Sequence, residues 1–201
     1  HILTDDIYEK IIYDGIKFTS FASAIPELKH RTLTLNGVSK AYCMTGWRLG
    51  YCGGPKEIIA GMNKIQSQST TSTSSISMAA SVEALNGKQS FIEEHNIQFK
   101  KRRDMVVERL NDIEGITCSL PSGAFYVYPS CSGIMGKKTK SGQIIDSDEK
   151  FMNYLLESEG VAGVQGEAFG LSPYFRLSYA TSEKILKEAC NRIAQACKNL
   201  N

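Results

Sequence analysis

Residues 36–51 read NGVSKAYCMTGWRLGY; they follow one short apolar segment, residues 31–36, and run into a second, residues 49–53. A third such segment, residues 2–4, stands near the start of the chain. Short apolar segments that alternate with loops and helical stretches are typical of strands in an α/β sheet. The stretch therefore predicts a loop at the edge of such a sheet, and this loop carries Lys40 and Arg48.

Lys40 and Arg48 have side chains that suit ligand chemistry. A lysine between Ser39 and Ala41 beside an apolar sheet loses part of its solvation, which favours its amine as a nucleophile. Arg48 presents a fork of donors that can bind a phosphate group. The alternative is a surface lysine with a structural arginine, which is the usual explanation for a single pair of this kind.

Asp5 and Tyr8 follow directly on the apolar segment 2–4, in the stretch DDIYEKIIYDG at residues 5–15. Ligands of open α/β sheets bind just outside the carboxyl ends of the strands, so polar groups placed there converge on a pocket. The alternative is a turn in which the aspartate caps the next segment. For this segment taken alone, the turn is the better explanation.

Four motifs in order resemble those of a known family, the class I aminotransferases, which depend on pyridoxal phosphate. They are DDIYEKIIYDG at 5–15, GVSKAYCMTGWRLG at 37–50, GAFYVYP at 123–129 and YFRLSYATS at 174–182. Their order and rough spacing resemble the bacterial aspartate aminotransferase branch, over nearly the whole chain. The resemblance implies an α/β fold, the C-terminal part of a fold-type I transferase. Residues 1–86 would end a mainly parallel cofactor-binding sheet domain, and residues 87–201 would form a smaller α/β domain with the long linking helix.

The resemblance also assigns roles to five residues. It implies that Lys40 bonds to the aldehyde of pyridoxal 5'-phosphate and moves the proton of the substrate. Asp5 would pair with the protonated ring nitrogen, and Tyr8 would donate a hydrogen bond to the ring oxygen. Arg48 would bind the phosphate, and Arg176 would hold the α-carboxylate of the substrate as a bidentate pair.

The implied activity is transfer of an amino group between an amino acid, with aspartate expected, and a 2-keto acid, through the pyridoxal and pyridoxamine forms of the cofactor. The resemblance implies a homodimer, and we expect neither nucleic acid nor membrane as a partner. The chain is expected to be a truncated piece, the C-terminal half, and inactive by itself. A catalytically incompetent fragment or a non-enzymatic regulatory module that binds pyridoxal phosphate is the alternative.

Composition agrees with an ordinary globular protein. The 201 residues are 42% hydrophobic and 22% charged, with a net charge of +2, which argues against a polyanionic partner. The six cysteines form no CxxC pair, and three histidines give no spacing that would hold a metal. We expect reduced thiols and a cytoplasmic protein, because no apolar run approaches the roughly 18 residues of a membrane span.

Periodicity and capping residues predict the remaining elements. Helices are expected at 55–66, 78–85, 90–112 and 147–159, with a final helix that Ser182 caps and that buries Cys190 and Cys197. Further strands are expected at 116–120, 123–129, 161–164 and 174–180. Residues 67–77, SQSTTSTSSIS, predict a loop, either a linker or the lining of a polar pocket. The basic run 100–103 predicts a solvated helix surface.

Overall fold

In the computed structural model, which describes residues 1–201, strand β2 (Thr32–Gly37) lies between β1 (Ile2–Asp5) and β3 (Gly50–Gly53). β1 runs parallel to β2, with Asp5 opposite Leu35, and β3 runs antiparallel to β2, with Gly37 opposite Gly50. The predicted strands at 2–4, 31–36 and 49–53 are confirmed. The carboxyl ends of β1 and β2 and the amino end of β3 therefore share one edge of this sheet.

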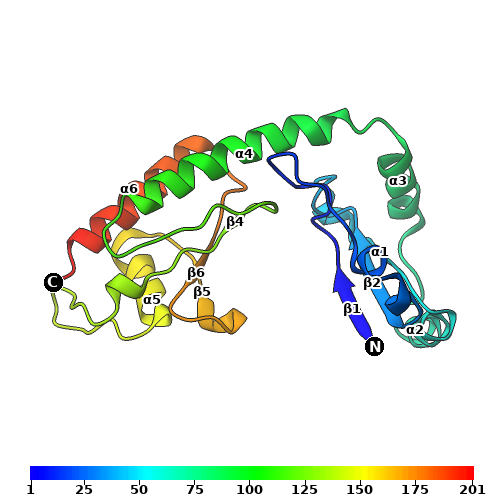
Figure 1. Ribbon diagram of the computed structural model, residues 1–201, viewed down its shortest axis with the longest axis horizontal. Coiled ribbons are helices and arrows are strands. Elements are labelled where there is room, and N and C mark those ends of the chain that lie inside the picture. Colours follow the sequence, from blue (N-terminus) through cyan, green and yellow to red (C-terminus); the bar gives the residue numbers. More distant parts are fainter. The chain divides into compact units, whose positions relative to one another are not determined.

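The chain divides into two compact units, His1–Asn96 and Ile97–Asn201, here called the first and second unit. The division falls inside helix α4 (Ser90–Asn111), so this helix contributes residues to both units (Figure 1). Each unit has a three-stranded sheet of its own. The first unit also contains α1 (Phe21–Ala24), a 3-10 helix at Pro26–Arg31, α2 (Lys56–Ser69) and α3 (Ser75–Asn86).

The prediction of a loop over residues 67–77 is wrong at both ends of this segment, because α2 extends to Ser69 and α3 begins at Ser75. Hydroxyl side chains often favour loops by competing for backbone hydrogen bonds. Here they bond within the helices instead: Ser67 Oγ donates to the Lys64 carbonyl at 2.9 Å, and Ser69 Oγ donates to the Ile65 carbonyl at 3.2 Å. Only residues 70–74 lie between the two helices.

The sheet of the second unit has β6 (Phe175–Ser178) between β4 (Tyr126–Val127) and β5 (Val164–Gln165), and both pairings are antiparallel. These strands are shorter than the sequence predicts. The prediction of a strand at 116–120 is wrong, because only Thr117 of this segment forms a β-bridge, which pairs it with Ser130.

The segment 116–120 is fastened to α4 rather than to a sheet. The amide of Asn111, at the end of α4, accepts a hydrogen bond from Cys118 N at 2.7 Å and donates one to the Cys118 carbonyl at 3.0 Å. A side chain therefore satisfies the backbone groups that a neighbouring strand would otherwise bond.

Helices α5 (Asp148–Glu159) and α6 (Glu183–Lys198) begin where the sequence predicts. Ser182 Oγ accepts from Ile185 N at 3.3 Å, so the predicted cap is confirmed, and Ser147 caps α5 in the same way by accepting from Lys150 N at 3.2 Å. Gly160 ends α5 with a φ of 65°, a conformation that glycine adopts without steric cost.

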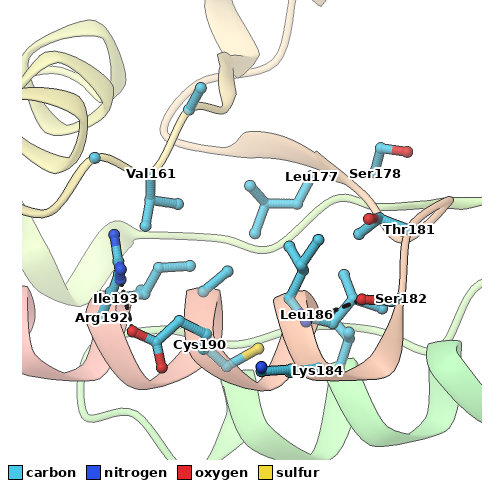
Figure 2. Close-up of a pocket in the computed structure, with 16 residues that line it drawn as sticks. Val161, Leu177, Ser178, Thr181, Ser182, Lys184, Leu186, Cys190, Arg192 and Ile193 are labelled. Carbon is cyan, nitrogen blue, oxygen red and sulfur yellow. Dashed lines mark hydrogen bonds and ion pairs between the residues drawn. The ribbon is translucent and has the colours of Figure 1, made fainter.

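A cavity of about 730 Å³ lies beside the first half of α6. Its walls are mostly apolar and come from α6, the end of β6 and the segment after α5, with Val161, Leu177 and Leu186 among the lining side chains (Figure 2). No helix of the chain is both long enough and apolar enough to cross a bilayer.

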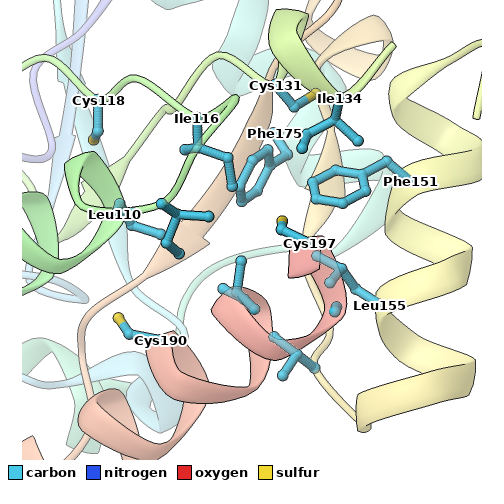
Figure 3. Packing of buried hydrophobic residues seen from close by; sticks show 14 of the residues in the cluster. Leu110, Ile116, Cys118, Cys131, Ile134, Phe151, Leu155, Phe175, Cys190 and Cys197 are labelled. Carbon is cyan, nitrogen blue, oxygen red and sulfur yellow. The ribbon is translucent and has the colours of Figure 1, made fainter. Parts of the chain in front are cut away.

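The core of the second unit is built around Phe151 and Phe175, both fully buried, whose rings meet nearly edge to face at 5.6 Å (Figure 3). Cys190 and Cys197 of α6 belong to this core, as predicted. Burial raises the pKa of the Cys197 thiol to about 12. Such thiols stay protonated and unreactive, and all six cysteines are free.

The prediction that residues 100–103 form a solvated helix surface is wrong for Arg103. Its side chain is 0% exposed, and Nη1 donates to the Pro121 carbonyl at 2.8 Å. Nε donates to Oδ1 of Asp104 at 2.8 Å, and Nη2 forms an ion pair with the same oxygen at 2.7 Å. Helix α4 thus buries the guanidinium of Arg103 inside the second unit, and the neighbouring carboxylate of Asp104 compensates its charge.

We predict that Asp104→Asn lowers the free energy of unfolding by about 1 kcal/mol at neutral pH, since the carboxylate is half exposed and screened by solvent. Burial acts to raise the pKa of Asp104, but hydrogen bonds from Lys100 and Arg103 outweigh it and lower this pKa from 3.8. The stabilisation is therefore present above the ordinary value and is lost as pH falls through the lowered one.

Urea unfolding of both proteins at a series of pH values checks this prediction. The difference between them should shrink toward zero in strong acid. Glu188→Gln, which removes the exposed ion pair of Glu188 with Arg192, serves as control and should have little effect. A difference that does not change with pH would contradict the assigned role of the Asp104 charge.

Candidate functional site

The strand pairings of the first unit bring three of the predicted site residues to one edge of its sheet. Asp5 is the last residue of β1, Lys40 lies in a turn three residues after β2, and Arg48 stands two residues before β3. Since β1 and β2 end at the edge where β3 begins, the three side chains leave the sheet at the same edge.

Lys40 and Tyr8 lie together at this edge. The Nζ atom of Lys40 lies 5.8 Å from the centroid of the Tyr8 ring, within the range of a cation–π contact. Both side chains are partly buried. The structure thus places an amine beside a phenol, and each comes from a turn that follows a strand.

Asp5 is exposed, and its Oδ1 accepts a hydrogen bond from Ile7 N at 3.2 Å. The turn weighed as an alternative explanation for Asp5 is therefore present, although it uses a single carboxylate oxygen. Burial raises the pKa of the adjacent Asp6, and the charges of Glu9 and Asp5 raise it further. Negative charge is concentrated around Asp5, which favours a cationic ligand group at this point.

Arg48 is exposed and has a left-handed backbone, with a φ of 50°. Its Nη1 donates to the Thr45 carbonyl at 2.8 Å, which holds the guanidinium over its own turn. A Cβ on Gly37 would lie 3.1 Å from the Leu49 carbonyl oxygen, so glycine allows this close approach of the chain segments. The other donors of the Arg48 fork remain able to bind an anion.

Two side chains near the start of α4 anchor the segments that carry Tyr8 and Lys40, and sequence reasoning missed both. The Tyr42 hydroxyl donates to Gln89 Oε1 at 3.1 Å, and Asn96 Nδ2 donates to the Lys10 carbonyl at 2.7 Å. These bonds join residues 47 and 86 positions apart. No local pattern signals such pairs.

Arg176 belongs to β6 of the second unit. Its guanidinium carbon lies 4.6 Å from the centroid of the Tyr126 ring and 4.5 Å from that of Phe169. Tyr126 lies within the motif GAFYVYP. Phe169 was missed, because it ends a short 3-10 helix, Gly166–Phe169, which leaves no strand or α-helix periodicity in the sequence.

The segment that carries Phe169 is held from both sides. The buried Asp148 accepts hydrogen bonds on Oδ2 from Glu167 N at 3.2 Å and Tyr174 N at 3.3 Å. The Tyr128 hydroxyl donates to the carbonyls of Gly166 and Leu171 at 3.1 and 3.3 Å. Burial, with the charge of Asp148, raises the pKa of Tyr128, so the phenol stays protonated and able to donate.

The cavity beside α6 contains none of the five predicted site residues. A second cavity, of about 430 Å³ between the end of α4 and α6, also contains none of these five residues. The chemical groups of the first unit instead stand on an open sheet edge.

Comparison with known proteins decides the family. Residues 1–193 match the family model described as "Aminotransferase class I and II". The chain belongs to the class I and II aminotransferases. The α/β fold, as the C-terminal part of a fold-type I transferase, is thereby confirmed.

This chain is similar over its whole length to individual aminotransferases. The aspartate aminotransferase of Rhizobium meliloti is 58% identical over 200 residues, which is 100% of this chain and 49% of that protein. The aspartate/prephenate aminotransferase of Cereibacter sphaeroides is 53% identical over 100% of this chain and 50% of that protein. The crystal structure of the Rhizobium meliloti enzyme superimposes with a TM-score of 0.96, covering 99% of this chain and 50% of that one. The chain thus spans about half the length of the relatives it matches.

Enzymes of this aminotransferase family depend on pyridoxal 5'-phosphate, and the groups at the first sheet edge fit this cofactor chemically. An amine suits its aldehyde, a guanidinium suits its phosphate, and a carboxylate suits its ring nitrogen when protonated. The structure supplies Lys40, Arg48 and Asp5 at one edge, with the Tyr8 phenol beside the amine.

We predict that Gly166→Ala disrupts the segment that carries Phe169. An added Cβ would overlap the Leu171 carbonyl oxygen and approach the Tyr174 carbonyl oxygen to 2.8 Å, and both atoms belong to the backbone. Overpacking of this kind costs about 1–3 kcal/mol. Thermal unfolding should show the loss.

Gly61→Ala is the matched control for this substitution. An added Cβ on Gly61, inside α2, meets nothing within 4 Å, so the change should be neutral or stabilising. Equal stability of the Gly166→Ala protein and the unsubstituted protein would contradict the packing described for this segment.

Proposed function

We propose that the chain is the C-terminal half of a pyridoxal-phosphate-dependent aminotransferase that moves an amino group between an amino acid and a 2-keto acid. The observation that carries the proposal is that Asp5, Lys40 and Arg48 stand on segments at the same edge of the first sheet, with Tyr8 beside the lysine. Membership of the aminotransferase family supports it, as does the coverage of about half of each relative.

Four residues of the first unit are proposed to hold the cofactor and to act beside it. When bound, the cofactor supplies an aldehyde that reacts with amines and a ring that withdraws electrons from the α-carbon of the substrate. Lys40 is the proposed catalytic residue, with Nζ accepting the α-proton and delivering it again. Asp5 keeps a negative charge at the ring nitrogen, Tyr8 donates a hydrogen bond to the ring oxygen, and Arg48 binds the phosphate.

Arg176 is the proposed group for the α-carboxylate of the substrate. A guanidinium binds a carboxylate through two parallel hydrogen bonds, which selects amino and 2-keto acids as a class. The similarity to proteins named aspartate and aspartate/prephenate aminotransferases supports aspartate as the amino donor. Prephenate is the second substrate to be tried, because one of those names includes it.

The proposal extends to the organisation of the whole enzyme. Residues 1–86 would complete the large cofactor-binding domain, and residues 87–201 would form the small domain with the linking helix. A homodimer is proposed on the family resemblance alone. A cytoplasmic location is supported by the six free cysteines.

The isolated 201-residue chain is proposed to be inactive. It spans about half of each relative, so a complete enzyme of their length would include as many residues again. Activity is therefore to be measured on the complete aminotransferase polypeptide that contains this chain. Transamination by the isolated chain would contradict this part of the proposal.

We predict that Lys40→Ala in the complete polypeptide abolishes the visible absorbance of covalently bound cofactor. It should also lower kcat about 100- to 10,000-fold, which is the usual contribution of a positioned general base. Absorption spectra with pyridoxal phosphate, recorded beside a transamination assay, check both effects. Lys29→Ala, at an exposed lysine of the same unit, should leave both unchanged. An unaltered spectrum in the Lys40→Ala protein would remove Lys40 from its proposed role.

We also predict that Arg176→Ala lowers kcat/KM for aspartate about 100-fold, because a charged bidentate pair is lost. Arg176→Lys keeps the charge without the fork and should recover only part of the loss. Arg31→Ala, at an exposed arginine, is the control and should behave as the unsubstituted enzyme. Full activity of Arg176→Ala on every amino acid tested would show that another group binds the carboxylate.

A further inference from the structure

The aromatic rings of Tyr126 and Phe169 stand close to the guanidinium of Arg176, and together they are called the aromatic clamp. We propose that the aromatic clamp positions Arg176 for carboxylate binding, with Phe169 and Tyr126 as positioning residues rather than catalytic ones. This inference rests on the proposed function, which assigns the carboxylate to Arg176. It adds two specific side chains that set the affinity for the substrate.

The alternation of side chains along β6 separates Arg176 from the core. Phe175 is fully buried, and Leu177 lines the cavity beside α6 (Figure 2). Val127, which is 1% exposed, pairs with Leu177. Successive residues of a strand point to opposite faces, so Tyr126 and Arg176 share the face turned away from the core.

Two rings from different elements meet the guanidinium on this face. The ring centroids of Tyr126, from β4, and Phe169, from the 3-10 helix Gly166–Phe169 after β5, lie 4.6 and 4.5 Å from the guanidinium carbon. Both distances are well inside the roughly 6 Å over which a cation is attracted to a ring face. Ring faces attract the cation without accepting its N–H groups in hydrogen bonds. Arg176 makes no hydrogen bond or ion pair within the chain, so its edge donors stay available.

Phe169 is held in place although core packing does not require it. Its ring is 48% exposed, yet Tyr128 meets it nearly edge-on at 6.1 Å, and Tyr128 in turn stacks on Tyr174 at 5.5 Å. The bonds from Tyr128 to the carbonyls of Gly166 and Leu171 fix the two ends of the segment that carries Phe169. A half-exposed ring supported in this way is explained by the cation that it faces.

The aromatic clamp acts by restricting the conformations of the Arg176 side chain. Arginine has many rotamers to lose when it binds a ligand, and a side chain already held in the bound orientation loses fewer. The gain applies to the bound substrate as well as to the transition state. The clamp is therefore expected to change KM and ligand affinity while kcat stays nearly constant.

Phe169→Leu, compared with Phe169→Tyr, tests the clamp in the complete aminotransferase. Leucine removes the aromatic face, while tyrosine keeps it. We expect Phe169→Leu to weaken binding of maleate, an unreactive dicarboxylate, by about 2- to 30-fold, in line with the strength of a cation–π contact. KM for aspartate should rise by a similar factor. Phe169→Tyr should stay within about 2-fold of the unsubstituted enzyme, and the cofactor spectrum should be unchanged in both.

The double variant Phe169→Leu with Arg176→Ala separates positioning from a general structural effect. If the ring acts through Arg176, the leucine substitution should add no further loss of maleate affinity once the guanidinium is gone. A further loss of the same size would overturn the inference, as would unchanged maleate binding by Phe169→Leu alone.

Failure of the proposed function has a different signature. Maleate binding by Arg176→Ala as tight as that of the unsubstituted enzyme would overturn the role of Arg176 itself, and the clamp with it. Loss of affinity in Arg176→Ala with none in Phe169→Leu would overturn the clamp alone.

Discussion

Strand β2 pairs in parallel with β1 and antiparallel with β3, and the candidate cofactor groups of the first unit leave the sheet where these pairings end. The register of the strands is critical, because a slip of one residue would turn Asp5, in β1, to the other face of the sheet and would shift the segments that carry Lys40 and Arg48. Gly37 and Gly50 stand opposite each other at the end of the ladder, where a Cβ on Gly37 would come within 3.4 Å of Gly50 Cα. The close approach of β2 and β3 therefore also keeps the segments that carry Lys40 and Arg48 at the same edge of the sheet.

Much of the fold could be predicted from the sequence because its signals are local. The three strands of the first sheet follow from short apolar segments, and the starts of α5 and α6 follow from the serines that cap them. The loop expected at 67–77 failed because the same hydroxyl groups that favour loops can also bond to a helical carbonyl. Composition alone does not distinguish the two outcomes.

The parts of the candidate site that sequence reasoning missed are contacts between distant residues. Asp148 lies at the start of α5 and reads as an ordinary first-turn acid, yet it is fully buried and binds two backbone N–H groups 19 and 26 residues away. Gln89 and Asn96 likewise act on segments far back in the chain. The motifs themselves predict which residues carry the chemistry. Which residues hold them in place depends on the tertiary structure.

Arg103 and Arg176 show how the same side chain serves two purposes within the second unit. Arg103 is 0% exposed, and a buried cation is tolerated only when acceptors compensate it, which Asp104 and the Pro121 carbonyl do. Arg176 is only partly buried and is held by two ring faces. Acceptors occupy the donors of a guanidinium, whereas ring faces fix its position and leave those donors available. Arg103 is therefore built as a structural group, and Arg176 has the surroundings of a group that binds an anion.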